Sequence, residues 1–246
     1  MDTPAKIAAA IDDIQAQLAR SGGTTVQLFQ KNLTYIPYPL PPTLKNLYCH
    51  KTRITTLPPL PPTLEALTCG GARITSLPPL PPTLRFLHCG KTLVTELPSL
   101  PPALEIICFH NTQITSLPPL PPTLKTLDCS NTQITSLPPL PPTLKNLCCS
   151  STRITELPLL PPRLSVLTCG DTRITSLPPL QHISLCQYII FNKHLLIKPP
   201  ENLGWGDRYS LYGNDLIEYD NKWFELYTRL GRALRAELAA RQLEKI

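Results

Sequence analysis

Apolar and polar positions along this chain follow a pattern that repeats every twenty residues. The leucine at position 44 recurs in register six more times, at Leu64, Leu84, Leu104, Leu124, Leu144 and Leu164. Each unit has the form LxxLxCxxTxITxLPxLPPx. Units of equal length in strict register predict a solenoid, in which each unit is one coil and buries its apolar residues against its neighbours.

The centre of each unit predicts a short strand. In the copy that starts at Leu124, the segment LKTLDC alternates apolar and polar side chains, as a strand with one buried face does. Six side chains of this copy should point inward: Leu120, Leu124, Leu127, Cys129, Ile134 and Leu137. Parallel strands stacked about 4.8 Å apart should then form one continuous sheet on the concave side.

The LPPLPP segment predicts the return path of each coil. Proline fixes its own φ and disfavours helix in the residue before it, so this segment should be extended polyproline II on the convex side. Of the 31 prolines, 28 lie between Pro37 and Pro179 in fixed positions beside leucines, so they indicate architecture rather than disorder.

The two ends of the repeat array predict caps, because a solenoid end exposes core. Residues 1–23 should form an N-terminal cap, with Thr3 capping a helix over 3–20 and Pro4 in its first turn. Residues 24–183 hold one degenerate copy and seven regular ones. Residues 184–246 should form a C-terminal cap with one or two last strands, a turn-rich segment and a long amphipathic helix from about 216 to 245. An alternative for that helix is a protruding arm for docking or oligomerisation.

The unit resembles the leucine-rich repeat at the short end of its range of periods, and the resemblance covers residues 44–183. It implies an α/β repeat solenoid that forms an arc, with strands on the concave side and helical caps at both ends. Threonine stands where that family usually has asparagine, at Thr52, Thr92, Thr112, Thr132, Thr152 and Thr172, with Ala72 as the exception. A hydroxyl can satisfy only part of what an amide satisfies in that turn.

One cysteine column runs through the units, and packing in the core is its favoured interpretation. The column holds Cys49, Cys69, Cys89, Cys129, Cys149 and Cys169, with Phe109 in the remaining copy. Stacked strands offer one thiol per level, which suits neither a metal site nor unstrained disulfides. Nine cysteines, an odd number, favour reduced thiols in an intracellular compartment.

A thiol enzyme is a remote alternative. Cys108 and Cys148 lie one position before the column and should face outward, and Cys108 should lie one strand from His88. No third orienting residue accompanies this pair, and no phosphate loop or zinc spacing is present. The sequence therefore predicts a protein that is not an enzyme and that needs no cofactor or metal.

Residues that differ between units at outward positions are the candidates for partner binding. Tyr48, Phe86, His88 and Ile106 should form an apolar and aromatic patch on the concave face. A second group is charged: Arg53, Arg73, Arg85, Lys125, Asp128, Arg153 and Arg173. Glu65 and Glu105 interrupt the column that contains Arg85 and Lys125. A solvated solenoid edge is the alternative for the charged residues.

Two further resemblances concern function. The LPxLPxxLxxL phrase looks like the repeats of secreted bacterial effectors of the YopM and IpaH type, and LxCxxTxIT with PPLPPTL looks like repeat proteins of giant DNA viruses. Both imply a non-catalytic scaffold that binds another protein inside a host cell. A minor component of a virion or another assembly is the alternative, and a ubiquitin-pathway factor is a remote one. The sequence does not fix the oligomeric state.

Charge and hydropathy narrow the location of the protein. The net charge of +6 is mild; it favours an acidic partner and falls short of a polybasic nucleic-acid tail. No apolar run reaches the length of a membrane span, and residues 1–20 lack a secretory pattern. We therefore expect a cytoplasmic protein, in a host cytoplasm or in a virion, with no membrane contact and with nucleic acid as an unfavoured partner.

Overall fold

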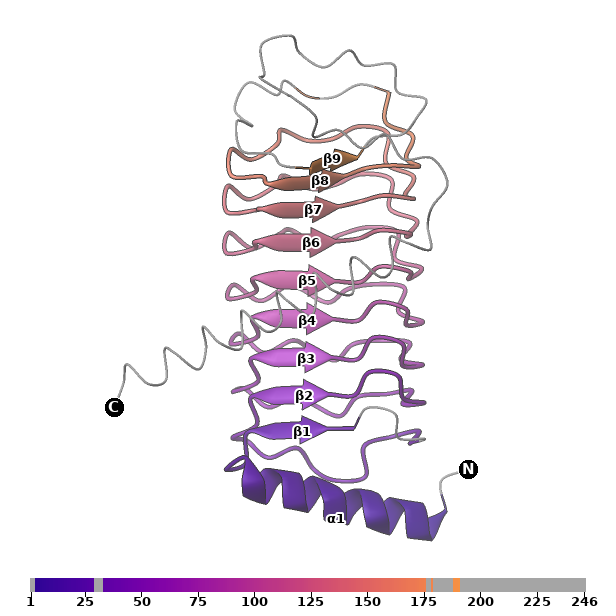
Figure 1. Cartoon of the computed structure of the whole chain (residues 1–246), viewed down its shortest axis with the longest axis vertical. Coiled ribbons are helices and arrows are strands. Elements are labelled where there is room, and N and C mark those ends of the chain that lie inside the picture. Colours follow the sequence, from indigo (N-terminus) through magenta and orange to yellow (C-terminus); the bar gives the residue numbers. More distant parts are fainter. Residues whose placement is uncertain (1–2, 29–32, 176–177, 179–187, 191–246) are drawn as a thin grey trace, which may run out of the picture. The chain divides into compact units, whose positions relative to one another are not determined.

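A computed structural model describes residues 3–28, 33–175, 178 and 188–190. Nine parallel strands of three residues each form one sheet in chain order, and one helix precedes them (Figure 1). The strands are β1 Thr25–Gln27, β2 Asn46–Tyr48, β3 Ala66–Thr68, β4 Phe86–His88, β5 Ile106–Cys108, β6 Thr126–Asp128, β7 Asn146–Cys148, β8 Val166–Thr168 and β9 Tyr188–Ile190. The expected solenoid of stacked coils is confirmed.

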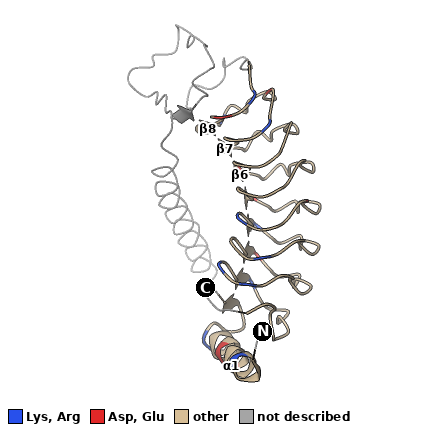
Figure 2. Cartoon of the chain, turned by 90° about the vertical axis from the view of Figure 1, so that its right-hand side faces the viewer, with Lys and Arg blue, Asp and Glu red and all other residues tan. Residues whose placement is uncertain are grey.

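The register of the sheet follows directly from the twenty-residue period. Leu47 pairs with Leu67, and each strand from β2 to β8 pairs with residues twenty positions further along or back. Seen from the side, the strands lie on one side of the coils and the proline-rich returns on the other (Figure 2). In each regular return a turn precedes the next strand; for example, Leu64 N donates to Pro61 O over 3.1 Å.

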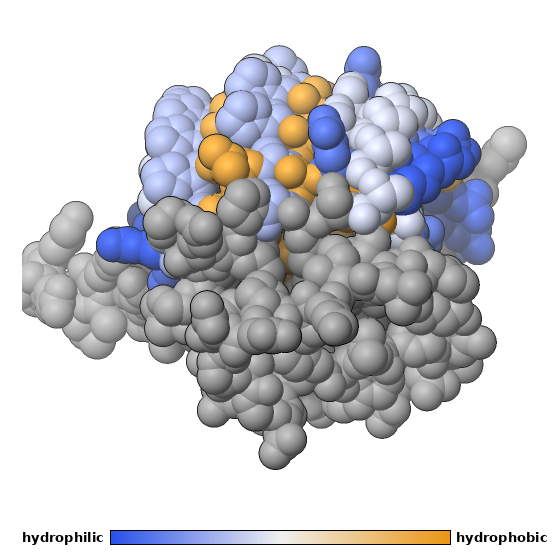
Figure 3. Space-filling view, turned by 90° about the horizontal axis from the view of Figure 1, so that it is seen from above, coloured by the Kyte–Doolittle hydropathy of each residue, from blue (hydrophilic) through white to orange (hydrophobic). Residues whose placement is uncertain are grey.

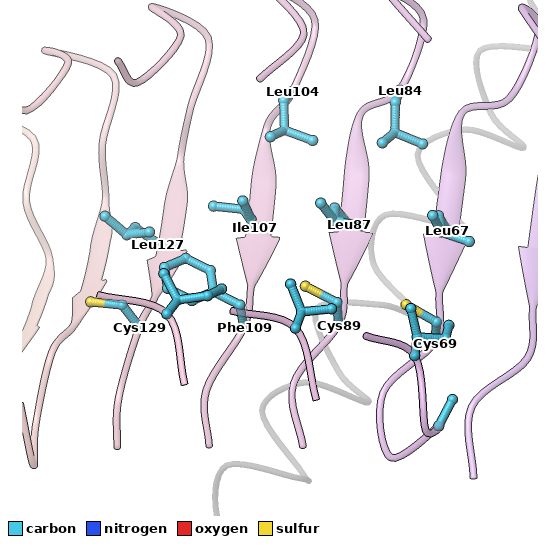
Figure 4. Close-up of a cluster of buried hydrophobic side chains, with 14 of the residues drawn as sticks. Leu67, Cys69, Leu84, Leu87, Cys89, Leu104, Ile107, Phe109, Leu127 and Cys129 are labelled. Atoms are coloured by element: carbon cyan, nitrogen blue, oxygen red, sulfur yellow. The ribbon is translucent and has the colours of Figure 1, made fainter. Parts of the chain in front are cut away.

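The core contains the residues that the repeat pattern predicts. In the copy that starts at Leu124, the side chains of Leu124, Leu127, Cys129 and Ile134 are fully buried. Leu120 and Leu137 are partly buried and pack against them. The cysteine column and Phe109 are also inside, next to the central residues of the strands (Figure 4).

The threonine after each cysteine closes the turn that leaves the strand. Its hydroxyl donates to the carbonyl oxygen three residues earlier, as from Thr52 to Cys49 over 2.8 Å and from Thr132 to Cys129 over 2.6 Å. In the exceptional copy the backbone does this instead, because Ala72 N donates to Cys69 O. A single threonine hydroxyl therefore closes this turn, although an asparagine amide could make more hydrogen bonds there.

A second column of threonines, which the sequence analysis missed, joins one return to the next. Thr63 Oγ1 lies 2.5 Å from Pro42 O and 2.9 Å from Leu44 O in the preceding coil, within donating distance of both. The same arrangement recurs at Thr83, Thr123 and Thr143. The signal was present, since a threonine follows Pro-Pro in most copies, but its partners lie in another coil.

Helix α1, Pro4–Arg20, covers the exposed edge of β1. Thr3 caps its first turn as expected, and Ala10 and Ile14 are buried. The Gln17 side-chain amide stands in for a further strand, because it donates to Gln27 O over 2.9 Å and accepts from Gln27 N over 2.6 Å. A capped edge cannot pair with another chain.

The C-terminal expectations fall largely outside the described residues. β9 lies in the segment where one or two last strands were expected, whereas the turn-rich segment and the amphipathic helix over about 216–245 lie beyond it. Within the described part of the chain, no helix has the length and apolar character required to cross a membrane.

Candidate functional site

The side chains that point away from the core at the first and third residue of each strand from β2 to β8 form a surface that we call the strand face. Its first column is Asn46, Ala66, Phe86, Ile106, Thr126, Asn146 and Val166, and its second is Tyr48, Thr68, His88, Cys108, Asp128, Cys148 and Thr168. These positions differ between coils, whereas the core positions largely recur.

The aromatic residues of the described strand face lie at the N-terminal half of the sheet. Tyr48, Phe86 and His88 are each partly exposed, and Phe86 pairs in register with Ile106. Ile106 was expected on the exposed patch, yet it is only 5% exposed. Phe86 and Thr126 lie beside it on the adjacent strands, and its side chain is buried although it belongs to a strand-face position.

Two histidines and one aspartate meet where the strand face ends. The His88 and His110 rings lie 5.5 Å apart, and His110 Nδ1 is 3.2 Å from Asp128 Oδ2. That contact is an ion pair when the imidazole is protonated, but its alignment is not that of a hydrogen bond. Asp128 was expected to be exposed and is buried; its carboxylate also accepts from Ser130 N over 3.1 Å.

Glycines make room for both imidazole rings. A Cβ atom at position 70 would lie 2.3 Å from Cε1 of His88, and one at Gly90 would lie 2.8 Å from Cε1 of His110. Each ring therefore lies over the backbone of the preceding coil. Because Gly70 and Gly90 have no side chains, the rings of His88 and His110 can lie at these positions. The aligned repeats do not show this relation, because the glycines and histidines stand in different columns.

Burial sets the protonation of this cluster. Removal from water, followed by the charge of His110, lowers the pKa of His88 to about 4, so its imidazole is neutral near pH 7. Burial alone would raise the pKa of Asp128, but its contact with His110 and the Ser130 N–H hold that pKa below its usual value. The cluster thus presents a neutral ring beside a buried carboxylate.

The charged column at the entrance of the strands is an alternating set of ion pairs. Lys45 Nζ lies 3.1 Å from Glu65, and Glu105 binds both Arg85 and Lys125, with Nε of Arg85 at 2.8 Å. Burial of Glu105 favours its neutral form, but the two cations outweigh it and lower the pKa of Glu105. Arg85 and Lys125, both predicted to bind a partner, are thus engaged within the column.

The four remaining arginines do not lie in the strand face. Arg53, Arg73, Arg153 and Arg173 follow the turn that leaves the strand, and all are exposed. The residue two positions earlier has positive φ in every regular coil, for example 54° at Lys51. This turn directs the chain away from the sheet, so these arginines belong to a separate edge of the stack.

The described thiols are buried in a way that opposes catalysis. Cys108 and Cys148 were expected to face outward as exposed residues, but they are 0% and 2% exposed. Burial, with the charge of Asp128 second, raises the pKa of Cys148 well above its usual value. Among the described residues, no group of three histidine, cysteine or acidic side chains has a geometry that could hold a metal ion.

We expect the native protein to resist thiol labelling. The eight described cysteines form no disulfide and are buried, and burial raises the pKa of both Cys49 and Cys89 to about 12. Because the thiolate is the reactive form, no more than one of the nine cysteines should react quickly with an aromatic disulfide reagent at pH 8. All nine should react in urea. Fast reaction of several thiols in the native state would contradict the core packing of the column.

Solved structures with the same coil arrangement include repeat domains of bacterial proteins. The leucine-rich-repeat domain of a Shigella effector aligns with a TM-score of 0.63 and 28% identity, over 68% of this chain and 77% of that one. YopM from Yersinia pestis aligns with a TM-score of 0.70 and 28% identity, over 76% of this chain and 55% of that one. This chain thus spans about half the length of YopM.

A third similar structure also contains a column of cysteines. The functional domain of InlJ from Listeria monocytogenes, which includes a cysteine ladder, aligns with a TM-score of 0.58 and 27% identity, over 68% of this chain and 36% of that one. No protein-family model matches the sequence, and a search of curated proteins finds no relative.

Proposed function

Because the chain folds as a leucine-rich-repeat solenoid, we propose that it is a non-catalytic scaffold that binds another protein through its strand face. The observation that supports this most is the group formed by Tyr48, Phe86 and His88, the aromatic residues of the described strand face. Large aromatic side chains on a rigid surface are the residues that most often dominate the energy of protein interfaces. The sheet holds them without a loop that would have to be ordered on binding.

The core of the coils is nearly constant, and this supports a binding role over a catalytic one. Scaffold residues recur at each level, while the strand-face residues change from strand to strand. Substitutions on a surface of this kind can change which partner is bound and leave the fold intact. The buried thiols and the neutral His88 provide no activated nucleophile.

We place the protein inside a host cell, as a viral or effector-like factor. The support is the similarity to bacterial effector repeat domains and the thiol form of the described cysteines, which suits a reducing compartment. The partner, in this proposal, is a host protein with an apolar surface patch that fits the aromatic group.

Phe86→Glu should abolish partner capture while leaving the fold intact. The carboxylate would lie in the middle of the aromatic contact, where a buried unpaired charge costs several kcal/mol, so capture should fall at least 30-fold. The measurement is affinity capture from infected cells with quantitative mass spectrometry, with circular dichroism as the folding check.

Leu159→Glu is the matched control, because Leu159 is 77% exposed and lies in a return rather than on the strand face. It adds the same charge and should capture the partner as well as the parent chain does. If deletion of residues 216–246 abolishes incorporation into a particle while Phe86→Glu has no effect, the protein is an assembly component and the proposal is wrong.

A further inference from the structure

A line of exposed residues on one edge of the stack forms a second surface that the strand face does not include. We call it the flank column, and it consists of Arg53, Arg73, Leu93, Gln113, Gln133, Arg153 and Arg173. All seven are exposed. They are related by the twenty-residue period, so neighbours in the column are about 4.8 Å apart along the stack.

The flank column is held by the backbone on an ordered surface. The N–H of Leu93 donates to Ile74 O, and the N–H of Arg153 donates to Ile134 O, each over 2.9 Å. Gln133 and Arg173 bond to the preceding coil in the same way. The side chains therefore project from fixed positions, which reduces the entropy lost when they bind.

The charges in the flank column come as two pairs. Arg53 and Arg73 lie on adjacent coils, as do Arg153 and Arg173, and four coil spacings, about 19 Å, separate the inner members. None of these four arginines has an ion-pair partner among the residues that the structure describes. Figure 2 faces this edge and shows basic segments both around β8 and in coils nearer α1.

The middle of the column is uncharged and in part apolar. Leu93 is 52% exposed, which makes it one of the few large apolar side chains at the surface of the described part. Gln113 and Gln133 follow it and can both donate and accept hydrogen bonds. Seen along the stack, strongly hydrophilic residues of the described part appear at both sides of the view, and apolar residues are visible between them (Figure 3).

We propose that the flank column binds an extended acidic peptide segment of a partner protein. Two acidic pairs of the segment bind the two arginine pairs, an apolar side chain covers Leu93, and the amides of Gln113 and Gln133 bond to its backbone. An extended chain spans about 3.3 Å per residue, so acidic pairs about six residues apart match the separation of the arginine pairs. Guanidinium groups bind carboxylates in a two-pronged geometry that suits this arrangement.

The same residues argue against nucleic acid as the occupant. Surfaces that follow a nucleic-acid strand combine continuous positive charge with aromatic side chains on which bases stack. The flank column lacks both features, because three uncharged residues interrupt its positive charge and none of its residues is aromatic.

Fluorescence anisotropy with the full chain tests the proposal. The probe is a fluorescein-labelled peptide with two glutamate pairs six residues apart and a leucine beside the first pair. We expect Arg53→Gln with Arg73→Gln to weaken binding of this peptide about tenfold at low ionic strength, and Arg153→Gln with Arg173→Gln to do the same. A peptide with glutamines in place of the glutamates should bind at least tenfold more weakly.

Two controls separate this surface from general charge and from the strand face. Lys145→Gln with Arg163→Gln removes the same charge from exposed residues outside the column and should leave peptide affinity unchanged within about twofold. Phe86→Glu should also leave peptide affinity unchanged within about twofold. The test of the flank column is therefore independent of the test of the proposed function. Lack of peptide binding, an equal loss in the Lys145 and Arg163 variant, or tighter binding of a single-stranded DNA of matched length would each overturn the proposal.

Discussion

Replacing Phe109 with alanine is expected to lower the free energy of unfolding by about 3–5 kcal/mol. Phe109 is the bulkiest fully buried side chain of the described residues and stands where six other coils have cysteine. Removing its ring loses apolar contact and leaves a cavity, because the coils on both sides are held by strand pairing and cannot close the space. Urea unfolding followed by circular dichroism measures the change.

Cys129→Ala serves as the control for Phe109→Ala. It alters the same column one coil further along and removes only one sulfur atom, so we expect a loss of about 1 kcal/mol. A loss below about 1 kcal/mol for Phe109→Ala would mean that the coils slide together and fill the cavity, contrary to a core fixed by its register.

Acidification from pH 7 to pH 4 should destabilise the protein by about 3 kcal/mol through His88 alone. In the unfolded chain this histidine takes up a proton near pH 6.5, whereas burial lowers its folded pKa to about 4. Between these values the unfolded state binds more protons, so stability is full above about pH 7 and falls as the pH drops through this window. Urea unfolding at a series of pH values gives the slope.

The acidic residue of the site, Asp128, affects stability at lower pH than His88 does. The folded pKa of Asp128 lies below its usual value, so its contribution is lost only as the pH falls further. His88→Thr places the residue of β3 and β8 in β4 and should flatten the slope between pH 6.5 and pH 4. An unchanged slope in that variant would assign the acid sensitivity to other groups.

The coil and its core were predictable because both depend on local spacing. A twenty-residue period with fixed apolar positions determines which side chains point inward and which residues pair, so Leu127 and Cys129 could be placed from the sequence. The position at which the strand ends was predictable for the same reason, because the turn after it is closed by a hydrogen bond of Thr132 within its own coil.

The candidate site was less predictable because its contacts run between columns. His88 and His110 differ by 22 positions, and His110 and Asp128 by 18, so an alignment in steps of twenty keeps the three apart. The turn after the strand brings them together. The burial of Ile106 and Asp128 was missed for a related reason, because alternation along a strand tells which way a side chain points and not how far neighbouring coils cover it.

The second threonine column bears on how such a chain changes length. Its bonds, like those of the sheet, join residues nineteen to twenty-one positions apart, as from Thr63 to Pro42 and Leu44. Unequal recombination that inserts or deletes one whole unit would therefore restore the backbone hydrogen bonds between adjacent coils. Loss of the unit that contains Gln113 would leave the core closed and shift the two arginine pairs one level closer together. Recognition on this edge could thus be retuned in discrete steps by changes in gene length, without a single substitution.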